Sequence, residues 1–369
     1  MENNYEFWQG YLKKLKSEIR KLCKAKETLQ IDLHIHSNYS ADGKQSITQI
    51  IENTNELGFD IVSITDHDTL DGYDELYEIV KNGFTKPLII PGIEFTMDNR
   101  EYGNQCHLLQ LFVNPKDKKI MQQVDKNKKA MFNRSKIQFK RLEENTTITT
   151  LKKEHKIKIS YDEYLKYLKL NNLIPEYDTL CFYLIDKFKE KKITTFKILD
   201  MLEKNNELDC YKDRMKLKQR RYRKLRDKYE VCTKNNYNSR FLLSMLAVRE
   251  VDDDWWDKPS SGSLSVNSYG QLKIEELDND YDIFFAHPDE KKFDVVEKII
   301  KGNKKFIGME KNKRNEYKDI NNFFNLREKL KVFMVIGSDS HDNTNEFYDD
   351  LKFYKLSSDE MLRIIKKCL

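Results

Sequence analysis

The sequence predicts an α/β fold that is built on a parallel sheet or barrel and is interrupted by one large helical insertion. Apolar runs of strand length alternate with helical segments over residues 30–114. The same alternation returns over residues 281–369. Between them, residues 115–280 are mostly charged, helical in pattern and outside the alternation. Because the α/β pattern resumes after residue 280, we interpret 115–280 as an insertion and not as a terminal domain.

Length and composition exclude several classes of protein. The chain has 369 residues, of which 39% are hydrophobic and 34% charged, and its net charge is +5. A core of good size is possible, but this net charge alone does not indicate nucleic acid. No apolar run reaches the roughly 18 residues of a membrane span, and the polar N-terminus lacks the hydrophobic region of a signal peptide. The six cysteines show no CxxC spacing, so we expect reduced thiols and a cytoplasmic protein.

The first element is an amphipathic helix predicted within residues 1–29. Apolar residues recur there at steps of three and four, with charged residues between them. These positions are Trp8, Tyr11, Leu12, Leu15, Ile19 and Leu22. We expect this stripe to dock on the α/β domain. The alternative is a helix that binds a partner protein or a second copy of the chain.

Seven strands and several helices follow in alternation, four strands before the insertion and three after it. The strands are predicted at residues 31–36, 60–65, 88–94, 106–113, 281–287, 306–310 and 332–337. Helices are predicted at 47–57, 73–82, 293–301 and 358–368. Gly58 and Gly302 stand at positions typical of helix ends.

The insertion contains two strongly basic stretches. Residues 116–141 hold ten lysines and arginines against two acids, and residues 211–230 hold ten against three. Such stretches either neutralise the phosphates of a nucleic acid or form solvated helix faces. Candidate substrate-binding residues in the insertion are Arg240, Lys216, Arg220, Arg221 and Lys224. Trp255 and Trp256 either stack on bases or anchor a loop, and we favour the anchor.

Histidine is concentrated at the predicted strand ends. Only His155, in a charged run, lies elsewhere, and we expect it to be solvated. His34 and His36 project to the same side of a strand because they are two residues apart. Since ligand sites in parallel α/β folds collect at the carboxyl ends of strands, closure into a barrel would bring nine residues to one rim. They are His34, His36, Asp42, His67, Glu94, His107, His287, Asp339 and His341.

Nine nitrogen and oxygen ligands without cysteine are too many for one ion. They suit two or three divalent ions, such as Mn²⁺, Zn²⁺ or Fe²⁺. Neighbouring ions can activate a water molecule and clamp the oxygens of a phosphoryl group, so no side chain is expected to act as nucleophile. Asp66 and Asp68 flank His67, and they either orient its ring or cap the loop.

Five short motifs carry a resemblance to a known family. They are Asp-Leu-His-Ile-His-Ser at 32–37 with Ala-Asp-Gly at 41–43, Ile-Thr-Asp-His-Asp-Thr at 64–69, Gly-Ile-Glu at 92–94, Ala-His-Pro at 286–288 and Gly-Ser-Asp-Ser-His at 337–341. In combination they resemble the PHP (polymerase and histidinol phosphatase) superfamily. The similarity is greatest to its stand-alone phosphoesterase branch, which includes a 5′–3′ exoribonuclease and nucleotide phosphatases.

The resemblance implies a distorted seven-stranded (β/α) barrel with a trinuclear site. By that pattern, His34, His36, Glu94 and Asp339 would hold one ion. Asp42, His67 and His341 would hold a second, and Glu94 with His107 and His287 a third. The insertion is larger than is usual in this branch, so the substrate cannot be carried over from the relatives.

The sequence therefore predicts a metal-dependent phosphoesterase, with three hypotheses for its role. The first is a nuclease on RNA or single-stranded DNA, in which the basic insertion guides the strand. The second is a small-molecule phosphatase acting on a nucleotide or a histidinol phosphate-like compound. The third is a non-catalytic binding subunit that metal ions stabilise, and the complete ligand set argues against it.

Overall fold

The computed structural model describes residues 4–205, 272–341 and 348–368, apart from gaps at 41–42, 100–101, 103, 172, 176, 194–196, 199–200, 202–203, 278–279, 314, 316 and 318. The chain forms two compact units. The first combines residues 1–127 with 271–369, and the second begins at Lys128. The candidate substrate-binding residues Lys216, Arg220, Arg221, Lys224 and Arg240 lie outside the described residues, as do Trp255, Trp256 and the basic stretch 211–230.

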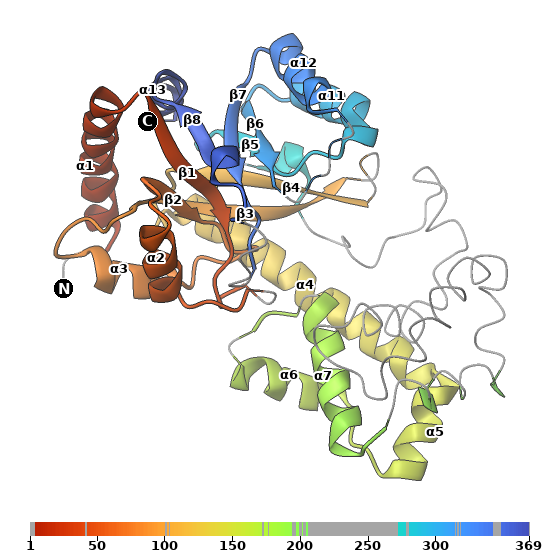
Figure 1. Ribbon diagram of the computed structural model, residues 1–369. Helices are drawn as coiled ribbons and strands as arrows, with labels where there is room; N and C mark the ends of the chain where they lie inside the picture. The colour runs from red at the N-terminus through yellow and green to blue at the C-terminus, as the bar shows by residue number, and fades with distance from the viewer. Residues whose placement is uncertain are drawn as a thin grey trace. The chain divides into compact units, whose positions relative to one another are not determined.

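The first unit is built on one sheet with the strand order β7-β6-β5-β4-β3-β2-β1-β8 (Figure 1). The strands are β1 (Thr28–Ile35), β2 (Ile61–Ile64), β3 (Leu88–Asn99), β4 (Asn104–Leu111), β5 (Ile283–Phe285), β6 (Phe306–Asn312), β7 (Phe333–Gly337) and β8 (Lys355–Ser357). The first seven correspond to the seven predicted strands. The short eighth strand was not predicted, and it pairs antiparallel with the beginning of β1.

The sheet curls until β1 and β7 meet. Ile35 and Ser340 form a parallel bridge beyond the end of β7. The His36 amide donates to the Ser340 carbonyl at 2.9 Å, and the Asp339 amide donates to the His34 carbonyl at 2.9 Å. The sheet is therefore a nearly closed barrel, and the predicted distorted (β/α) barrel is confirmed.

The expectation of a purely parallel sheet is wrong for β4. This strand runs antiparallel to both β3 and β5, whereas the pairs β1–β2, β2–β3, β5–β6 and β6–β7 are parallel. Only four residues separate Asn99 from Asn104. A connection this short can return a strand beside its neighbour but cannot cross over to start a parallel one.

Helices cover the outside of the barrel (Figure 1). They are α1 (Asn4–Ala25), α2 (Ile47–Glu56), α3 (Tyr73–Val80), α11 (Phe293–Gly302), α12 (Ile320–Leu330) and α13 (Ser358–Lys367), and short 3₁₀ turns lie at Ile274–Glu276, Glu290–Lys292 and Leu351–Tyr354. Helix α2 begins with a capping box between Ser46 and Gln49, and Gly58 follows it with φ +78°.

The apolar stripe of α1 is buried within the chain. Trp8, Leu15 and Ile19 are fully buried, and the Tyr11 hydroxyl donates to the Ile89 carbonyl of β3 at 2.9 Å. The helix also packs against α13. These contacts are what we expect of a helix that docks its apolar stripe on the α/β domain. A protein partner for residues 1–29 remains a prediction.

The second unit has its own apolar core. Its described helices are α4 (Lys118–Glu144), which begins in the first unit, α5 (Thr146–His155), α6 (Tyr161–Leu170) and α7 (Tyr177–Glu190). Phe139, Leu151, Tyr164 and Tyr183 are among the buried residues of this core. His155, half-buried at the end of α5, faces the ammonium group of Lys197 at 2.6 Å. The bounds predicted for the insertion, 115–280, remain a prediction.

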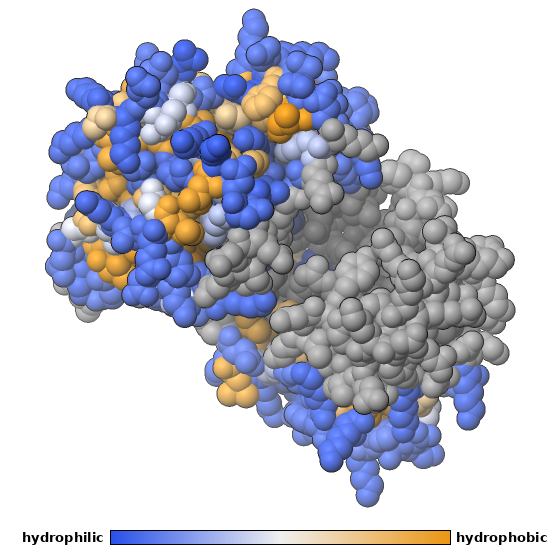
Figure 2. Space-filling view, in the orientation of Figure 1, coloured by the Kyte–Doolittle hydropathy of each residue, from blue (hydrophilic) through white to orange (hydrophobic). Residues whose placement is uncertain are grey.

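No helix in the described part of the chain is long and apolar enough to cross a membrane. Figure 2 shows a described surface that is mostly hydrophilic on the face in view, with smaller apolar areas between the polar ones.

Candidate metal centre

The carboxyl end of β1 supplies the most deeply buried part of the site. His34 and His36 project to the same side and are fully buried, with their Nε2 atoms 3.0 Å apart. Glu94 of β3, also fully buried, places Oε2 3.1 Å from each of these nitrogens. Asp339 follows β7 and places Oδ1 3.1 Å from His36 Nε2 and 3.5 Å from His34 Nε2. Four side chains from three strands therefore converge on one point.

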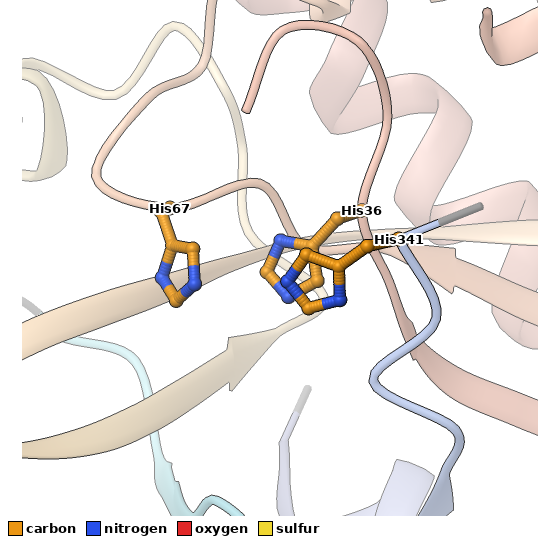
Figure 3. Close-up of side chains that lie close together, drawn as sticks. All are labelled: His36, His67 and His341. Carbon is orange, nitrogen blue, oxygen red and sulfur yellow. The ribbon is translucent and has the colours of Figure 1, made fainter. Parts of the chain in front are cut away.

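A second group lies beside His36 (Figure 3). His67 comes from the loop after β2 and His341 from the segment after β7. Their ring centroids lie 4.5 and 4.3 Å from that of His36, and one nitrogen of each of the three rings lies within 4.8 Å of the others. His67 Nδ1 is also 3.0 Å from Glu94 Oε2. Asp42, the remaining ligand predicted here, lies outside the described residues.

A third group surrounds the other oxygen of Glu94. His107 Nδ1 and His287 Nε2 each lie 3.1 Å from Glu94 Oε1 and 3.1 Å from each other. His107 stands near the beginning of β4 and not at a carboxyl end. Since β4 is reversed, its first half lies beside the second half of β3, where His107 pairs with Thr96. The reversal thus delivers a ligand that parallel strand ends alone would not supply.

Glu94 Oε2 shows that these residues fit metal ions. This oxygen is buried and accepts no hydrogen bond among the described residues, although three ring nitrogens lie within 3.0–3.1 Å of it. A buried carboxylate oxygen without a donor is costly in free energy, and a cation at this point would remove the cost. The donors are imidazole nitrogens and carboxylate oxygens, which suit Zn²⁺, Mn²⁺ or Fe²⁺.

The charges of the site act strongly on one another. Burial alone would raise the pKa of Glu94, but the facing rings of His34, His67 and His107 hold it well below its usual range. Burial alone would lower the pKa of His34, but the carboxylates of Glu94 and Glu310 raise it well above its ordinary value. Glu94 is therefore ionised and available to a cation.

Three of the seven described non-glycine residues with positive φ lie at the site. Asp68, His287 and Asp339 have φ values of +48°, +26° and +55°, in the left-handed region that residues other than glycine seldom occupy. Two of them are predicted ligands, and the third follows the predicted ligand His67 directly. Such conformations cost roughly 1–3 kcal/mol each and cluster at functional sites.

Asp66 and Asp68 bind the backbone of neighbouring segments. Asp66 accepts hydrogen bonds from the amide and the hydroxyl of Ser37, both at 2.6 Å. Asp68 accepts from the Thr96 amide at 3.1 Å and from the Asn127 side chain at 2.7 Å. These contacts are with other segments of the chain, and the two roles predicted for Asp66 and Asp68 remain predictions. They hold the loop of His67 against β1 and β3.

Three supporting residues were not singled out from the sequence. Asp32, buried at the start of the ligand-bearing part of β1, accepts from the Ser338 amide at 2.9 Å and the Tyr348 hydroxyl at 3.0 Å. Ser40 Oγ lies 3.3 Å from His36 Nδ1 and accepts from the His67 amide at 3.0 Å. Glu310, at the end of the predicted strand 306–310, lies 3.0 Å from His34 Nδ1. A signal was present for Asp32, which alternates with His34 and His36, and for Glu310, a carboxylate at a strand end.

The chain was compared with protein families, curated proteins and solved structures. The family model described as PHP domain matches residues 32–311. No curated protein matches the chain. Among solved structures, a candidate metal-dependent phosphoesterase from Bifidobacterium adolescentis has a TM-score of 0.52 and 17% identity, covering 91% of this chain and 94% of that chain. An amidohydrolase from Chromobacterium violaceum has a TM-score of 0.48 and 14% identity, covering 89% of this chain and 98% of the other.

Proposed function

Because this chain belongs to the PHP domain family, we propose that it is a metal-dependent hydrolase whose substrates are phosphoric esters. The observation that carries the proposal is the position of Glu94. One of its oxygens faces His34, His36 and His67, and the other faces His107 and His287. A single buried carboxylate is thus shared between groups of ligands, as a site for several ions requires.

The residues that would hold the ions fall into three groups around Glu94. They are His34, His36, Glu94 and Asp339 in the first, His67 and His341 beside His36 in the second, and Glu94, His107 and His287 in the third. The resemblance adds Asp42, which lies outside the described residues, to the second group. Bound divalent ions lower the pKa of a water molecule and offset the negative charge of a phosphoryl group.

The predicted ligands differ in how deeply they are buried. The side chains of His34, His36 and Glu94 are fully buried and form the floor of the site. Those of His107 and His287 are 18% and 26% exposed, so they are the more accessible of the predicted ligands. A substrate phosphate would therefore approach over His107 and His287, while the buried floor keeps bulk water from the ligands beneath.

The substrate class is the finer part of the proposal. A nuclease acting on RNA or single-stranded DNA is supported by the basic character of the chain after β4. Six lysines of α4 are exposed, namely Lys118, Lys119, Lys126, Lys129, Lys136 and Lys140. Lysines spaced along a helix can neutralise successive phosphates of a strand. The resemblance to the exoribonuclease-containing branch points the same way.

A small-molecule phosphatase is the second candidate, and one observation favours it. Two of the six lysines already face acids, Lys126 at 2.9 Å from Glu276 and Lys119 at 3.6 Å from Asp280. These pairs reduce the charge that α4 offers to a polyanion. The two candidates share the same metal centre and differ in the substrate, which is a phosphodiester within a strand for the nuclease and the phosphomonoester of a small molecule for the phosphatase.

The test is a hydrolysis assay of the Mn²⁺-loaded protein on three substrates in parallel: 5′-labelled RNA, 5′-labelled single-stranded DNA, and mononucleotides. The proposal expects Mn²⁺-dependent cleavage of at least one labelled strand, and no cleavage by the Asp339→Ala/His341→Ala double variant. Release of phosphate from mononucleotides alone would replace the nuclease by the phosphatase. Absence of activity on all three would overturn the catalytic proposal in favour of a binding role.

A further inference from the structure

Glu310 of β6 is a buried carboxylate that contacts two predicted metal ligands. Its side chain is fully buried. Oε1 lies 3.0 Å from His34 Nδ1 and accepts a hydrogen bond from Asn312 Nδ2 at 2.8 Å. Oε2 accepts from the backbone amide of His287 at 2.7 Å. Glu310 itself belongs to none of the three ligand groups.

The contact with His34 determines which ring nitrogen is free. A carboxylate can only accept hydrogen bonds, so His34 Nδ1 must carry the proton that faces Glu310. The other nitrogen, Nε2, is the one that lies 3.1 Å from Glu94 and 3.0 Å from His36 Nε2. A hydrogen bond at one imidazole nitrogen fixes the ring and leaves the opposite nitrogen to the metal.

The contact with His287 holds a strained backbone. His287 has φ +26°, and its amide is the group that Glu310 Oε2 accepts. The ring of the same residue places Nε2 3.1 Å from Glu94 Oε1. Glu310 therefore holds the backbone of His287 in a conformation in which its ring reaches Glu94.

The fold reserves space for this arrangement at Gly337, the last residue of β7. A Cβ atom on Gly337 would lie 2.1 Å from Glu310 Oε1 and 2.4 Å from His34 Cβ. Any side chain there would push Glu310 away from His34. Three neighbouring strands, β1, β6 and β7, thus cooperate to place one carboxylate.

We propose that Glu310 is a positioning residue that orients ligands of two different groups, His34 through its ring and His287 through its backbone. The proposal deepens the function inferred above and rests on the metal centre that it requires. Loss of Glu310 should weaken the binding of more than one ion, although the residue is not among the predicted ligands.

The test compares Glu310→Gln and Glu310→Asp with the wild type by titrating Mn²⁺ and Zn²⁺ against a competing chelator. Glu310→Gln replaces one carboxylate oxygen by an NH₂ group, which can only donate hydrogen bonds. Whichever way the amide is turned, this group faces another donor. It meets either His34 Nδ1–H and Asn312, or the His287 amide. We expect its metal affinity to fall about 10- to 100-fold, as is typical when an outer contact of a ligand is removed. Glu310→Asp keeps the charge but shortens the side chain by one methylene. Its metal affinity should therefore lie between those of the wild type and Glu310→Gln.

The matched control is Glu360→Gln. Glu360 is also a buried glutamate, and it accepts a hydrogen bond from the Met334 amide at 2.9 Å and from Arg327 Nη2 at 2.6 Å, with none of the predicted ligands among these partners. Its substitution should leave metal affinity unchanged. Wild-type affinity in both Glu310 variants, or an equal loss in Glu310→Gln and Glu360→Gln, would overturn the proposal. If Glu310→Gln does not fold, the affinity of Glu310→Asp decides.

A second readout separates this proposal from the proposed function. In ¹⁵N-histidine NMR spectra of the metal-free protein, His34 should show a hydrogen-bonded Nδ1 proton. Its chemical shift should move upfield in Glu310→Gln, where a neutral amide replaces the carboxylate, or, if that variant does not fold, in Glu310→Asp. A wild-type protein that binds no ion but shows this proton would overturn the metal centre and keep the role of Glu310. The absence of the proton in the wild type would contradict the role of Glu310 whatever the metal content.

Discussion

At the scale of the residue, the site depends on Glu94 and on the backbone around it. Its two oxygens face different histidines, and the groups on either side come from β1, β4 and the segments after β2, β5 and β7. Among the described residues, this carboxylate lies between the ligands of all these segments. Small changes in its surroundings should therefore affect several ligands together.

Gly337→Ala tests how closely the residues beneath the site are packed. The added methyl group would meet Glu310 Oε1 at 2.1 Å and His34 Cβ at 2.4 Å. We expect a loss of stability of about 1–3 kcal/mol, as for other overpacked cores, together with weaker metal binding. Urea denaturation and metal titration measure the two effects. Gly10→Ala is the control, since nothing lies within 4 Å of its added carbon. Equal stability in the two variants would contradict the close approach of β1, β6 and β7.

The sequence predicted the ligand residues more readily than their supports, for a reason of frequency. The chain has only seven histidines but 61 acidic residues. Six histidines at strand ends therefore stand out, whereas Glu310 and Asp32 are two acids among many. They are distinguished by complete burial and by the hydrogen bonds that they accept from backbone amides. Neither property can be seen without the fold. Asp32 also shows that alternation with His34 and His36 places a residue on their face without making it a ligand.

At the scale of the element, strand direction and docking decide which side chains meet. The apolar pattern of residues 106–113 predicted a strand but not its direction, because hydrophobic runs look the same either way. The four-residue connection after Asn99 was the available signal for the reversal of β4. The three residues of β8 are too few to show any period, so that strand could not be predicted. Helix α1 was predicted because its stripe spans several turns.

The packing of α1 gives a prediction for stability. Leu15 is fully buried, so Leu15→Ala should destabilise the protein by about 2–5 kcal/mol through the lost apolar contacts and the cavity. Its neighbour Lys14 is exposed, and Lys14→Ala should have little effect. The measurement is the free energy of unfolding in urea. A small effect of Leu15→Ala would mean that α1 does not depend on this contact.

Asn127 of α4 connects the insertion to the barrel within the first unit. It is fully buried, donates to Asp68 Oδ1 at 2.7 Å and to the Thr96 carbonyl at 3.1 Å, and accepts from the Leu272 amide at 2.8 Å. Asn127→Ala would remove all three hydrogen bonds, although Asp68 Oδ1 would still accept from the Thr96 amide. We expect a cost of about 1–3 kcal/mol for each buried group that is left unsatisfied. The control is Asn133→Ala, an exposed position of the same helix. Similar melting temperatures of the two variants would argue against this connection.

At the scale of the whole molecule, the metal centre should stabilise the barrel that forms it. The predicted ligands lie on segments as far apart in the chain as β1 and the segment after β7, and these segments come together only in the folded state. Ions that bind the native state alone raise its stability by mass action. The net charge of +5 and the two basic stretches bear on which substrate the protein binds. Of the two stretches, only residues 116–141 are described, and most of them lie in α4.

Removal of metal should therefore lower the melting temperature. At an ion concentration 100 times the dissociation constant, binding at one site adds about 2.7 kcal/mol of stability. We expect EDTA to lower the melting temperature of the wild type, excess Mn²⁺ or Zn²⁺ to restore it, and Asp339→Ala to respond much less to either. Differential scanning calorimetry measures these shifts. Equal responses of Asp339→Ala and the wild type would show that the stabilising ions bind elsewhere.

The metal content of the purified protein tests the central claim most directly. Inductively coupled plasma mass spectrometry of the wild type should find two to three divalent ions per chain. His36→Ala should hold fewer, because His36 Nε2 lies within 3.1 Å of Glu94, Asp339 and the Nε2 atom of His34. A wild type without ions, or a His36→Ala variant with its full number, would contradict the site described here.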